Sequence, residues 1–311
     1  MTGKAVYLDC PAFLEQLYSA ELRAIVPGLV LNIGDPPNGD TPALLTGAFG
    51  ALNDHTYMDA EALAACHDLK VIVFMGTGAS SYIDVDAAEK LGIRVRTIRD
   101  YGNRTIAEHA VALMFAAARQ VATMDRAVRR GHWEVLDGIE LEHKTLGVIG
   151  TGGIGREMVR LGHGLGMKVL AWNRSGVPDD LPCEQCELDD LLTRSDVVSI
   201  HLALTEQTEG LIDARRIALL GADGILINTA RGAITDETAL VSALQNSRIR
   251  HAGLDVFDEE PLPTGHPLLT LENVTLTSHA GFMTTEASVR LLRMALEIMR
   301  EELIEAGFAP G

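Results

Sequence analysis

The sequence predicts an α/β protein made of two Rossmann-like domains, each with a doubly wound parallel sheet. Short apolar segments alternate with helical segments along the chain, which is the pattern of a parallel sheet covered on both faces. A G-x-G-x-x-G motif begins at Gly150, directly after an apolar segment and at the start of a helical one. The 311 residues are also enough for two domains of roughly 100–200 residues each.

Apolar periodicity orders the elements of the first half. A helix is expected where Phe13, Leu14 and Leu17 recur at helical spacing, and another at residues 83–91. Strands are expected at residues 4–8, 43–46, 71–75 and 94–97. Together these elements predict one small doubly wound domain.

The second half begins with a stretch rich in Ala, Val, Leu and Met at residues 107–120, which predicts a helix buried on most sides. Strands are then expected at residues 145–149, 168–172, 197–201, 224–228, 251–256 and 274–277. Helices are expected at residues 154–165, 188–193, 213–220, 236–245 and, as one amphipathic element, 285–306.

Composition narrows the classes of partner. The formal net charge is -17, and a surface this acidic repels phosphate backbones and anionic lipid headgroups, so we expect no nucleic acid and no membrane partner. The first residues lack the apolar stretch of a signal peptide, and no apolar run reaches the roughly 18 residues of a membrane span. These features predict a cytoplasmic protein.

The chain has four cysteines, too few and too scattered for a disulfide framework. Cys183 and Cys186 form a C-x-x-C pair, but no second ligand pair that would complete a zinc site is evident nearby. A redox-active pair would open a helix after a strand, whereas this one lies in an acidic, proline-containing stretch. We expect a reduced surface pair and no metal site.

The G-x-G-x-x-G motif predicts a dinucleotide-binding turn. Gly150 permits the tight turn, Gly152 lets the backbone approach a pyrophosphate, and Gly155 packs the helix on the strand. Gly153 and Ile154 open the helix, whose N-terminal amides face the phosphates. The strand–turn–helix context separates this motif from a glycine-rich turn without a ligand.

The residues after the next strand indicate which dinucleotide binds. An acidic residue there would bind the ribose 2′-hydroxyl of NAD, but this chain has Asn173, Arg174 and Ser175. Nothing in that tripeptide repels a 2′-phosphate, and Arg174 and Ser175 can bind one. The sequence therefore predicts an NAD(P)(H) site and favours NADP(H). In the alternative, Arg174 stacks on the adenine or points to solvent.

A series of motifs over residues 70–285 carries a resemblance to a known family. They are Ile106-Ala-Glu-His109, Gly131-His-Trp133, Lys144-Thr-Leu-Gly-Val-Ile-Gly150, Ser195-Asp-Val-Val-Ser-Ile-His201, Asn228-Thr-Ala-Arg-Gly232, Leu254-Asp-Val-Phe257, Glu259-Glu-Pro261 and Ser278-His-Ala-Gly281. In this order and spacing, the chain resembles the D-isomer-specific 2-hydroxyacid dehydrogenases.

The resemblance implies two Rossmann-like domains with a cleft between them. An NAD(P)-binding domain at residues 101–284 would be inserted into a substrate domain formed by residues 1–100 and 285–311. It also implies a homodimer joined through the segment just before the glycine motif. The implied reaction moves a hydride between NAD(P)H and a small 2-keto acid or D-2-hydroxy acid, with glyoxylate, hydroxypyruvate and phosphoglycerate-type substrates all open.

The resemblance assigns catalysis to Arg231, Glu260 and His279, and these residue types suit the chemistry. A guanidinium stays charged and its planar fork can hold carboxylate and carbonyl oxygens, so Arg231 is expected to bind substrate. An imidazole titrates near neutral pH, so His279 can contact the substrate and deliver the proton. Glu260 would favour the imidazolium and orient it, although Glu259 is a rival. Taken singly, each has an ordinary structural reading.

Further residues are assigned by the same resemblance. Asp255 resembles the residue that accepts a hydrogen bond from the nicotinamide carboxamide, with a strand-end cap as its alternative role. His109 and His201 also match family motifs, but buried histidines are usually hydrogen-bonded core residues, so structural roles are favoured. The other residues expected at the cofactor are Thr229, Ala230 and Gly281.

The chain departs from the family pattern in two places. The turn after the strand ending near Met75 has an apparent extra residue and no acid. Backbone amides of Thr77, Gly78 and Ala79 can still hold a substrate carboxylate there, beside an unusual side-chain pocket. The usual proline after His201 is also missing, which affects backbone stiffness.

Two other functions fit parts of the pattern. Formate- or phosphite-type dehydrogenases of the same superfamily act on small anions and need little side-chain pocket. An NAD(H)-sensing binding protein similar to the family's transcriptional corepressors would keep the fold without the activity. The acidic charge argues against the second function.

Overall fold

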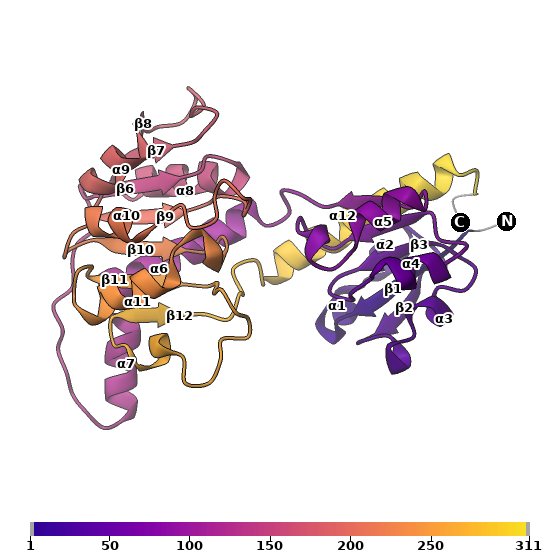
Figure 1. Cartoon of the computed structure of the whole chain (residues 1–311), viewed down its shortest axis with the longest axis horizontal. Helices are drawn as coiled ribbons and strands as arrows, with labels where there is room; N and C mark the ends of the chain where they lie inside the picture. Colours follow the sequence, from indigo (N-terminus) through magenta and orange to yellow (C-terminus); the bar gives the residue numbers. More distant parts are fainter. Residues whose placement is uncertain (1–2, 309–311) are drawn as a thin grey trace. The chain divides into compact units, whose positions relative to one another are not determined.

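The computed structural model describes residues 3–308, which divide into two α/β units (Figure 1). The first unit holds residues up to 102 and from 283 onward, and the second holds residues 103–282. The boundaries expected from the sequence lie after residues 100 and 284. Both sheets are parallel, which confirms the predicted fold class. The assignment of substrate binding to the first unit and of cofactor binding to the second stays a prediction.

The first unit has a five-stranded sheet in the order β2-β1-β3-β4-β5. Its strands are β1 (Lys4–Cys10), β2 (Val30–Ile33), β3 (Ala48–Asn53), β4 (Val71–Phe74) and β5 (Arg94–Thr97). Its helices are α1 (Ala12–Leu17), α2 (Ala20–Arg23), α3 (Thr41–Leu44), α4 (Ala60–Ala65), α5 (Val85–Lys90) and α12 (Thr285–Glu305), with short 3-10 turns at Pro37–Gly39 and Ala79–Ser81.

The strand expected at residues 43–46 is wrong, because the first half of that segment ends α3, the second half is a turn, and β3 begins only at Ala48. The side chain of Asp40 accepts a hydrogen bond from the Ala43 amide and caps the helix. Pro42 sits in the first turn, where its missing amide costs no helical hydrogen bond. Strand β2 was not predicted, since it is a half-exposed edge strand without a fully apolar run.

The last helix closes the core of the first unit. Helix α12 packs against β3 and β4, and a Cβ on Gly50 of β3 would crowd the Met299 sulfur. About one turn further along α12, the buried carboxylate of Glu302 pairs with Arg94 and Arg96 of edge strand β5. The first unit is therefore assembled from both ends of the chain.

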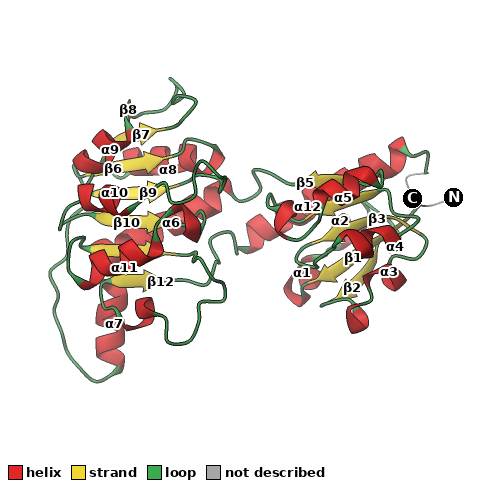
Figure 2. Cartoon of the chain, viewed as in Figure 1, coloured by secondary structure: helices red, strands yellow, loops and turns green. Residues whose placement is uncertain are grey.

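The second unit has a seven-stranded sheet in the order β12-β11-β10-β9-β6-β7-β8 (Figure 2). Its strands are β6 (Thr145–Ile149), β7 (Lys168–Trp172), β8 (Glu184–Gln185), β9 (Val197–Ile200), β10 (Ile225–Asn228), β11 (His251–Leu254) and β12 (Val274–Leu276). Its helices are α6 (Asn103–Ala118), α7 (Val121–Arg129), α8 (Gly153–Gly164), α9 (Leu188–Arg194), α10 (Ala214–Leu219) and α11 (Glu237–Gln245), with 3-10 turns at Gly232–Ile234 and Pro267–Thr270.

Two apolar layers cover this sheet. Alternate strand residues pack on one face with α9, α10 and α11, and on the other face with α6 and α8. The chain order reverses between β6 and β9, so the edge beyond their carboxyl ends is where such a sheet binds ligands. The strands predicted over this half all form, while β8 and α7 were missed. Within residues 3–308, no helix is long and apolar enough to cross a membrane.

Candidate active site

The glycine-rich turn after β6 depends on close backbone contacts. Gly150 has a φ of 94°, in the left-handed region, and a Cβ there would overlap the carbonyl oxygen of His201. A Cβ on Gly155 would overlap the carbonyl oxygen of Gly150, so glycine lets α8 start against the end of β6. A Cβ on Gly152, by contrast, would meet no described atom within 4 Å. The backbone of Gly152 thus faces open space.

Two buried hydroxyl groups at this edge are left without partners. Oγ1 of Thr151, beside the glycine turn, and Oγ1 of Thr229, after β10, have no hydrogen-bond partner among the described residues. Buried polar atoms are normally satisfied, so these hydroxyls point to a ligand with polar groups. A polar edge with an open glycine backbone fits a dinucleotide.

The turn after β7 is tied to the glycine turn. Asn173 accepts at Oδ1 from the Thr151 amide (3.4 Å) and donates from Nδ2 to Ser175 Oγ (2.8 Å). Arg174 is exposed and donates from Nη1 to Oε1 of Gln207. Within the described residues, Arg174 forms no ion pair with a carboxylate.

Arg231 leaves the sheet on a turn held by Asn228, the last residue of β10. Asn228 accepts at Oδ1 from the Ala230 amide (2.9 Å) and donates from Nδ2 to the Arg231 carbonyl (2.9 Å). A Cβ on Gly232 would overlap the backbone of Phe257, so glycine lets this turn pack on the loop after β11. The exposed Arg231 guanidinium donates to the Ala230 carbonyl (2.6 Å).

The structure brings His279 and Glu260 together. Nδ1 of His279 lies 2.6 Å from Oε2 of Glu260, and the Phe257 amide donates to Oε1 of Glu260 (2.9 Å). A carboxylate accepts only, so Nδ1 carries the hydrogen and Nε2 is left for exchange. Glu259 is exposed and makes no such contact among the described residues, so Glu260 is the partner of the histidine.

Asp255 holds the segment that carries His279. Its carboxylate, 1% exposed, accepts from Thr277 Oγ1 (2.5 Å) and from the amides of Ala280 (2.9 Å) and Gly281 (2.9 Å). Nε2 of His109 lies 3.3 Å from Oδ1. Burial opposes ionisation, but these hydrogen bonds outweigh it and lower the pKa of Asp255. Asp255 thus serves as a strand-end cap, and contact with a carboxamide stays a prediction.

His201 directly follows β9 in a buried position. Its Nε2 and the hydroxyl of Ser199 are 2.8 Å apart, and burial lowers its pKa to about 3. The ring is therefore neutral, but its Nδ1 has no hydrogen-bond partner among the described residues, so the structural role favoured for it stays a prediction. Sequence reasoning gave no role to Asn228 or Gln207. Asn228 stood inside a quoted motif, whereas Gln207 carried no local signal.

The turn expected to bind the substrate carboxylate lies in the first unit, after β4. Met75 donates its amide to the Asn53 carbonyl (2.8 Å), which ties this turn to the end of β3. The amides of Thr77 and Gly78 have no acceptor in the described part of the chain, and Ala79, which is buried, begins a 3-10 turn. The backbone here can donate to an anion.

The pair of cysteines around β8 is split across the sheet. Cys183 packs with the layer beneath α6 and α8, and Cys186 packs with the layer beneath α9. Burial raises the pKa of both thiols. No group of three metal-ligating side chains occurs among residues 3–308.

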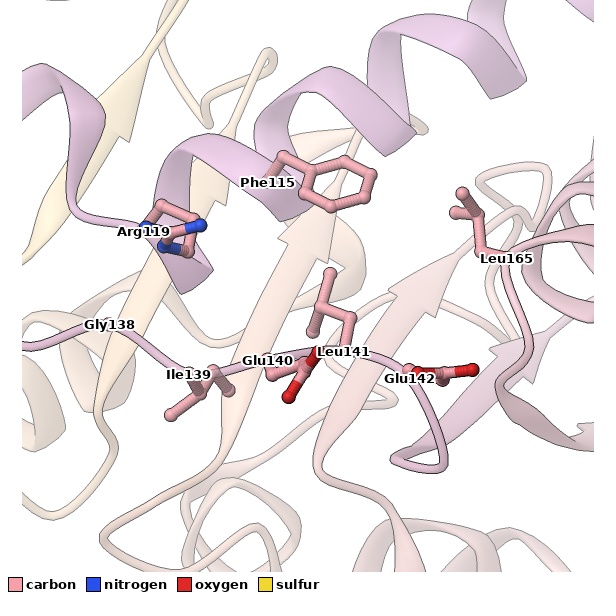
Figure 3. Close-up of a pocket in the computed structure, with 8 residues that line it drawn as sticks. All are labelled: Phe115, Arg119, Gly138, Ile139, Glu140, Leu141, Glu142 and Leu165. Atoms are coloured by element: carbon pink, nitrogen blue, oxygen red, sulfur yellow. The ribbon is translucent and has the colours of Figure 1, made fainter.

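One pocket of about 410 Å³ lies away from these residues (Figure 3). It sits in the second unit, under the segment that precedes β6, and none of the predicted site residues lines it. Its lining residues are Phe115, Arg119, Gly138, Ile139, Glu140, Leu141, Glu142 and Leu165.

Comparisons with known proteins agree on one family. A model described as D-isomer specific 2-hydroxyacid dehydrogenase, NAD binding domain, matches residues 111–281. The chain is 39% identical over 252 residues to a glyoxylate reductase of Aeropyrum pernix, covering 77% of this chain and 75% of that protein. It is 38% identical over 257 residues to a hydroxypyruvate reductase of Thermotoga maritima, covering 81% and 82%. The solved structure of an acyclic imino acid reductase in complex with NADPH and D-Arg matches with a TM-score of 0.81 and 28% identity, covering 98% of each chain.

Proposed function

The chain belongs to the D-isomer-specific 2-hydroxyacid dehydrogenase family, and on that premise we propose that Arg231, Glu260 and His279 catalyse its oxidoreductase reaction. The reaction moves a hydride between a nicotinamide cofactor and C2 of a small 2-keto acid or D-2-hydroxy acid. The observation that carries the assignment is the 2.6 Å contact between His279 Nδ1 and Glu260 Oε2.

Each of the three side chains has a distinct task. Glu260 accepts the Nδ1 hydrogen, so it stabilises the imidazolium and leaves Nε2 to donate a proton to the substrate carbonyl oxygen. Arg231 holds the substrate carboxylate and polarises the ketone with its planar fork. A bound nicotinamide supplies the hydride in reduction and takes it up in oxidation. Asn228 and Asp255 fix the two turns on which Arg231 and His279 stand.

The cofactor is held by the turns at the ends of β6, β7 and β10. Gly152 and the start of α8 would receive the pyrophosphate, with Gly153 and Ile154 at the helix start. Arg174 and Ser175 would receive a 2′-phosphate, which supports NADP(H) over NAD(H). The remaining proposed contacts are Asn173, Thr229, Ala230, Asp255 and Gly281.

The substrate is proposed to be a small 2-keto acid. The backbone amides of Thr77 and Gly78, which have no acceptor among the described residues, are proposed as donors to a carboxylate. Glyoxylate and hydroxypyruvate are the favoured substrates. The chain matches a glyoxylate reductase over 75% of its length and a hydroxypyruvate reductase over 82% of its length. Steady-state assays of glyoxylate, hydroxypyruvate and 3-phosphohydroxypyruvate with NADH and NADPH, and of formate and phosphite with NAD⁺ and NADP⁺, test this. Activity on formate or phosphite alone would reject it, and dinucleotide binding without any turnover would favour a sensing protein.

A homodimer formed through the segment before β6 is also part of the proposal. Trp133 is 87% exposed and Val135 is 85% exposed within this segment, and such side chains are usually covered in an assembly. Light scattering after size exclusion tests the dimer, and Trp133→Glu should shift it to monomer. A fluorescent fusion tests the expected cytoplasmic location.

A further inference from the structure

We propose that Gln207 is a positioning residue that sets the preference for a 2′-phosphorylated nicotinamide cofactor, because it holds the Arg174 guanidinium without neutralising its charge. The inference rests on the proposed binding of NADP(H) after β7. It adds a residue from a distant part of the sequence to that site, 33 positions along the chain.

Arg174 is held by a neutral partner and so keeps its positive charge. Its Nη1 donates to an amide oxygen of Gln207, and it has no carboxylate partner among residues 3–308. Several other exposed arginines of the same unit are neutralised by carboxylates, such as Arg215 by Asp189 and Arg194 by Asp190. Within the described chain, Arg119 and Arg248 are not, but neither of them follows a strand that flanks the glycine-rich turn. In a chain of formal net charge -17, Arg174 is therefore a guanidinium beside that turn whose charge remains available to an anion.

The contact between Arg174 and Gln207 lies beside the glycine-rich turn. Gln207 follows β9 and Arg174 follows β7, and these two strands flank β6 in the sheet. The Arg174–Gln207 hydrogen bond therefore links the turns on either side of the glycine-rich turn. A dinucleotide whose pyrophosphate meets Gly152 would have its adenosine end at this edge.

Gln207 lies in a turn that is closed by hydrogen bonds of Thr208. Thr208 donates from Oγ1 to the Ala203 carbonyl (2.7 Å) and accepts at Oγ1 from the Thr205 amide (2.8 Å). The Thr208 amide donates to the Thr205 carbonyl (2.9 Å). The turn is closed by its own hydrogen bonds, so the amide of Gln207 meets Arg174 in a fixed direction.

Arg174 and Ser175 offer hydrogen-bond donors to a phosphate. Ser175 Oγ accepts from Asn173 Nδ2 (2.8 Å), so its own hydrogen remains free to donate. Arg174 and Ser175 thus present donors and no negative charge. A carboxylate at position 207 would neutralise the charge of Arg174 and repel a phosphate dianion, whereas the amide of Gln207 accepts the hydrogen bond without doing either.

The test is the near-isosteric change Gln207→Glu in the full chain, with NADP⁺ and NAD⁺ titrated separately by calorimetry. We expect the dissociation constant for NADP⁺ to rise about tenfold and that for NAD⁺ to stay within about twofold, with the difference shrinking as salt is raised. Gln207→Ala should raise the NADP⁺ constant by about threefold. Gln207→Glu should be silent in an Arg174→Ala background.

Gln245→Glu is the matched control. It adds the same charge on an exposed side chain of α11 and should leave both dissociation constants unchanged. Equal weakening of NADP⁺ and NAD⁺ by Gln207→Glu, or no change in their ratio, overturns the role of Gln207. If the unaltered protein binds NADP⁺ and NAD⁺ equally, the proposed preference for NADP(H) is rejected instead. In that case, a change in the ratio of the two dissociation constants in Gln207→Glu still supports the positioning role of Gln207. Binding of neither rejects both.

Discussion

Nδ1 of His279 faces the Glu260 carboxylate at 2.6 Å, so one nitrogen of the ring is engaged and Nε2 remains the group that can exchange a proton. The Phe257 amide holds the other oxygen of Glu260, and the His279 amide donates to the Asp255 carbonyl (2.8 Å). Both members of the pair are therefore fixed by backbone as well as by each other.

Glu260→Gln should lower kcat for keto-acid reduction by about 100-fold, because an amide cannot stabilise the imidazolium. The cofactor dissociation constant should change little, since Glu260 is not proposed to contact the cofactor. Glu259→Gln is the control, because Glu259 carries the same charge one position earlier. Equal losses in the two variants would contradict the assignment.

His279→Gln should lower kcat in both directions by roughly 10²–10⁴-fold. In the unaltered protein, kcat/KM for reduction should fall as pH rises, since reduction consumes the imidazolium proton. The kcat/KM for oxidation should rise over the same range, since oxidation needs the neutral ring. Steady-state rates from pH 5 to 9 check this, and a variant that keeps both slopes would remove His279 from the mechanism.

Arg231→Lys should lower kcat/KM for the keto acid by about 10- to 100-fold, because lysine keeps the charge but loses the planar pair of donors. The protein should fold normally, since the Arg231 side chain is exposed. Arg215→Lys, at an exposed arginine paired with Asp189, is the control. If KM and kcat both stay unchanged in Arg231→Lys, another cation binds the carboxylate.

Asp54, just after β3, should make the protein less stable as pH rises. Burial raises its pKa to about 6, nearby Asp9 adds to this, and His55 opposes it. The folded state then holds the proton more tightly than the unfolded state, so this contribution is present below pH 4 and is lost as pH rises toward 6.

Asp54→Asn removes the group, so its effect on stability should depend on pH. Relative to the unaltered protein, the free energy of unfolding of the variant should be about 1–3 kcal/mol larger, that is more stabilising, at pH 7.5 than at pH 4.5. Urea denaturation followed by circular dichroism at both pH values measures it. Asp86→Asn, at an exposed position of α5, should show no such difference. The same result for both variants would refute the role of burial at Asp54.

The sequence was most informative where one local pattern determines one element. The strands ending at Ile149 and Trp172 were predicted to the residue, because each is a short apolar run with a turn directly after it. Residues 43–46 failed, because a short apolar run suits a helix as well as a strand, and the Asp40 cap decided the outcome.

The site divides in the same way. Single motifs carried Gly150, Arg231 and His279, but the choice between Glu259 and Glu260 depends on how one loop curls, which no local pattern encodes. The Arg174–Gln207 contact depends on the lateral order of strands, so it could not be seen before the sheet was known.

Because α12 belongs to the first unit, that unit cannot fold completely until α12 has been synthesised. Residues 103–282 are complete once the ribosome has passed the second unit, so that sheet can close while the chain is still growing. Until α12 emerges, Gly50 lacks its cover and Arg94 and Arg96 lack Glu302. The first unit is therefore the first to begin synthesis and the last to complete its fold.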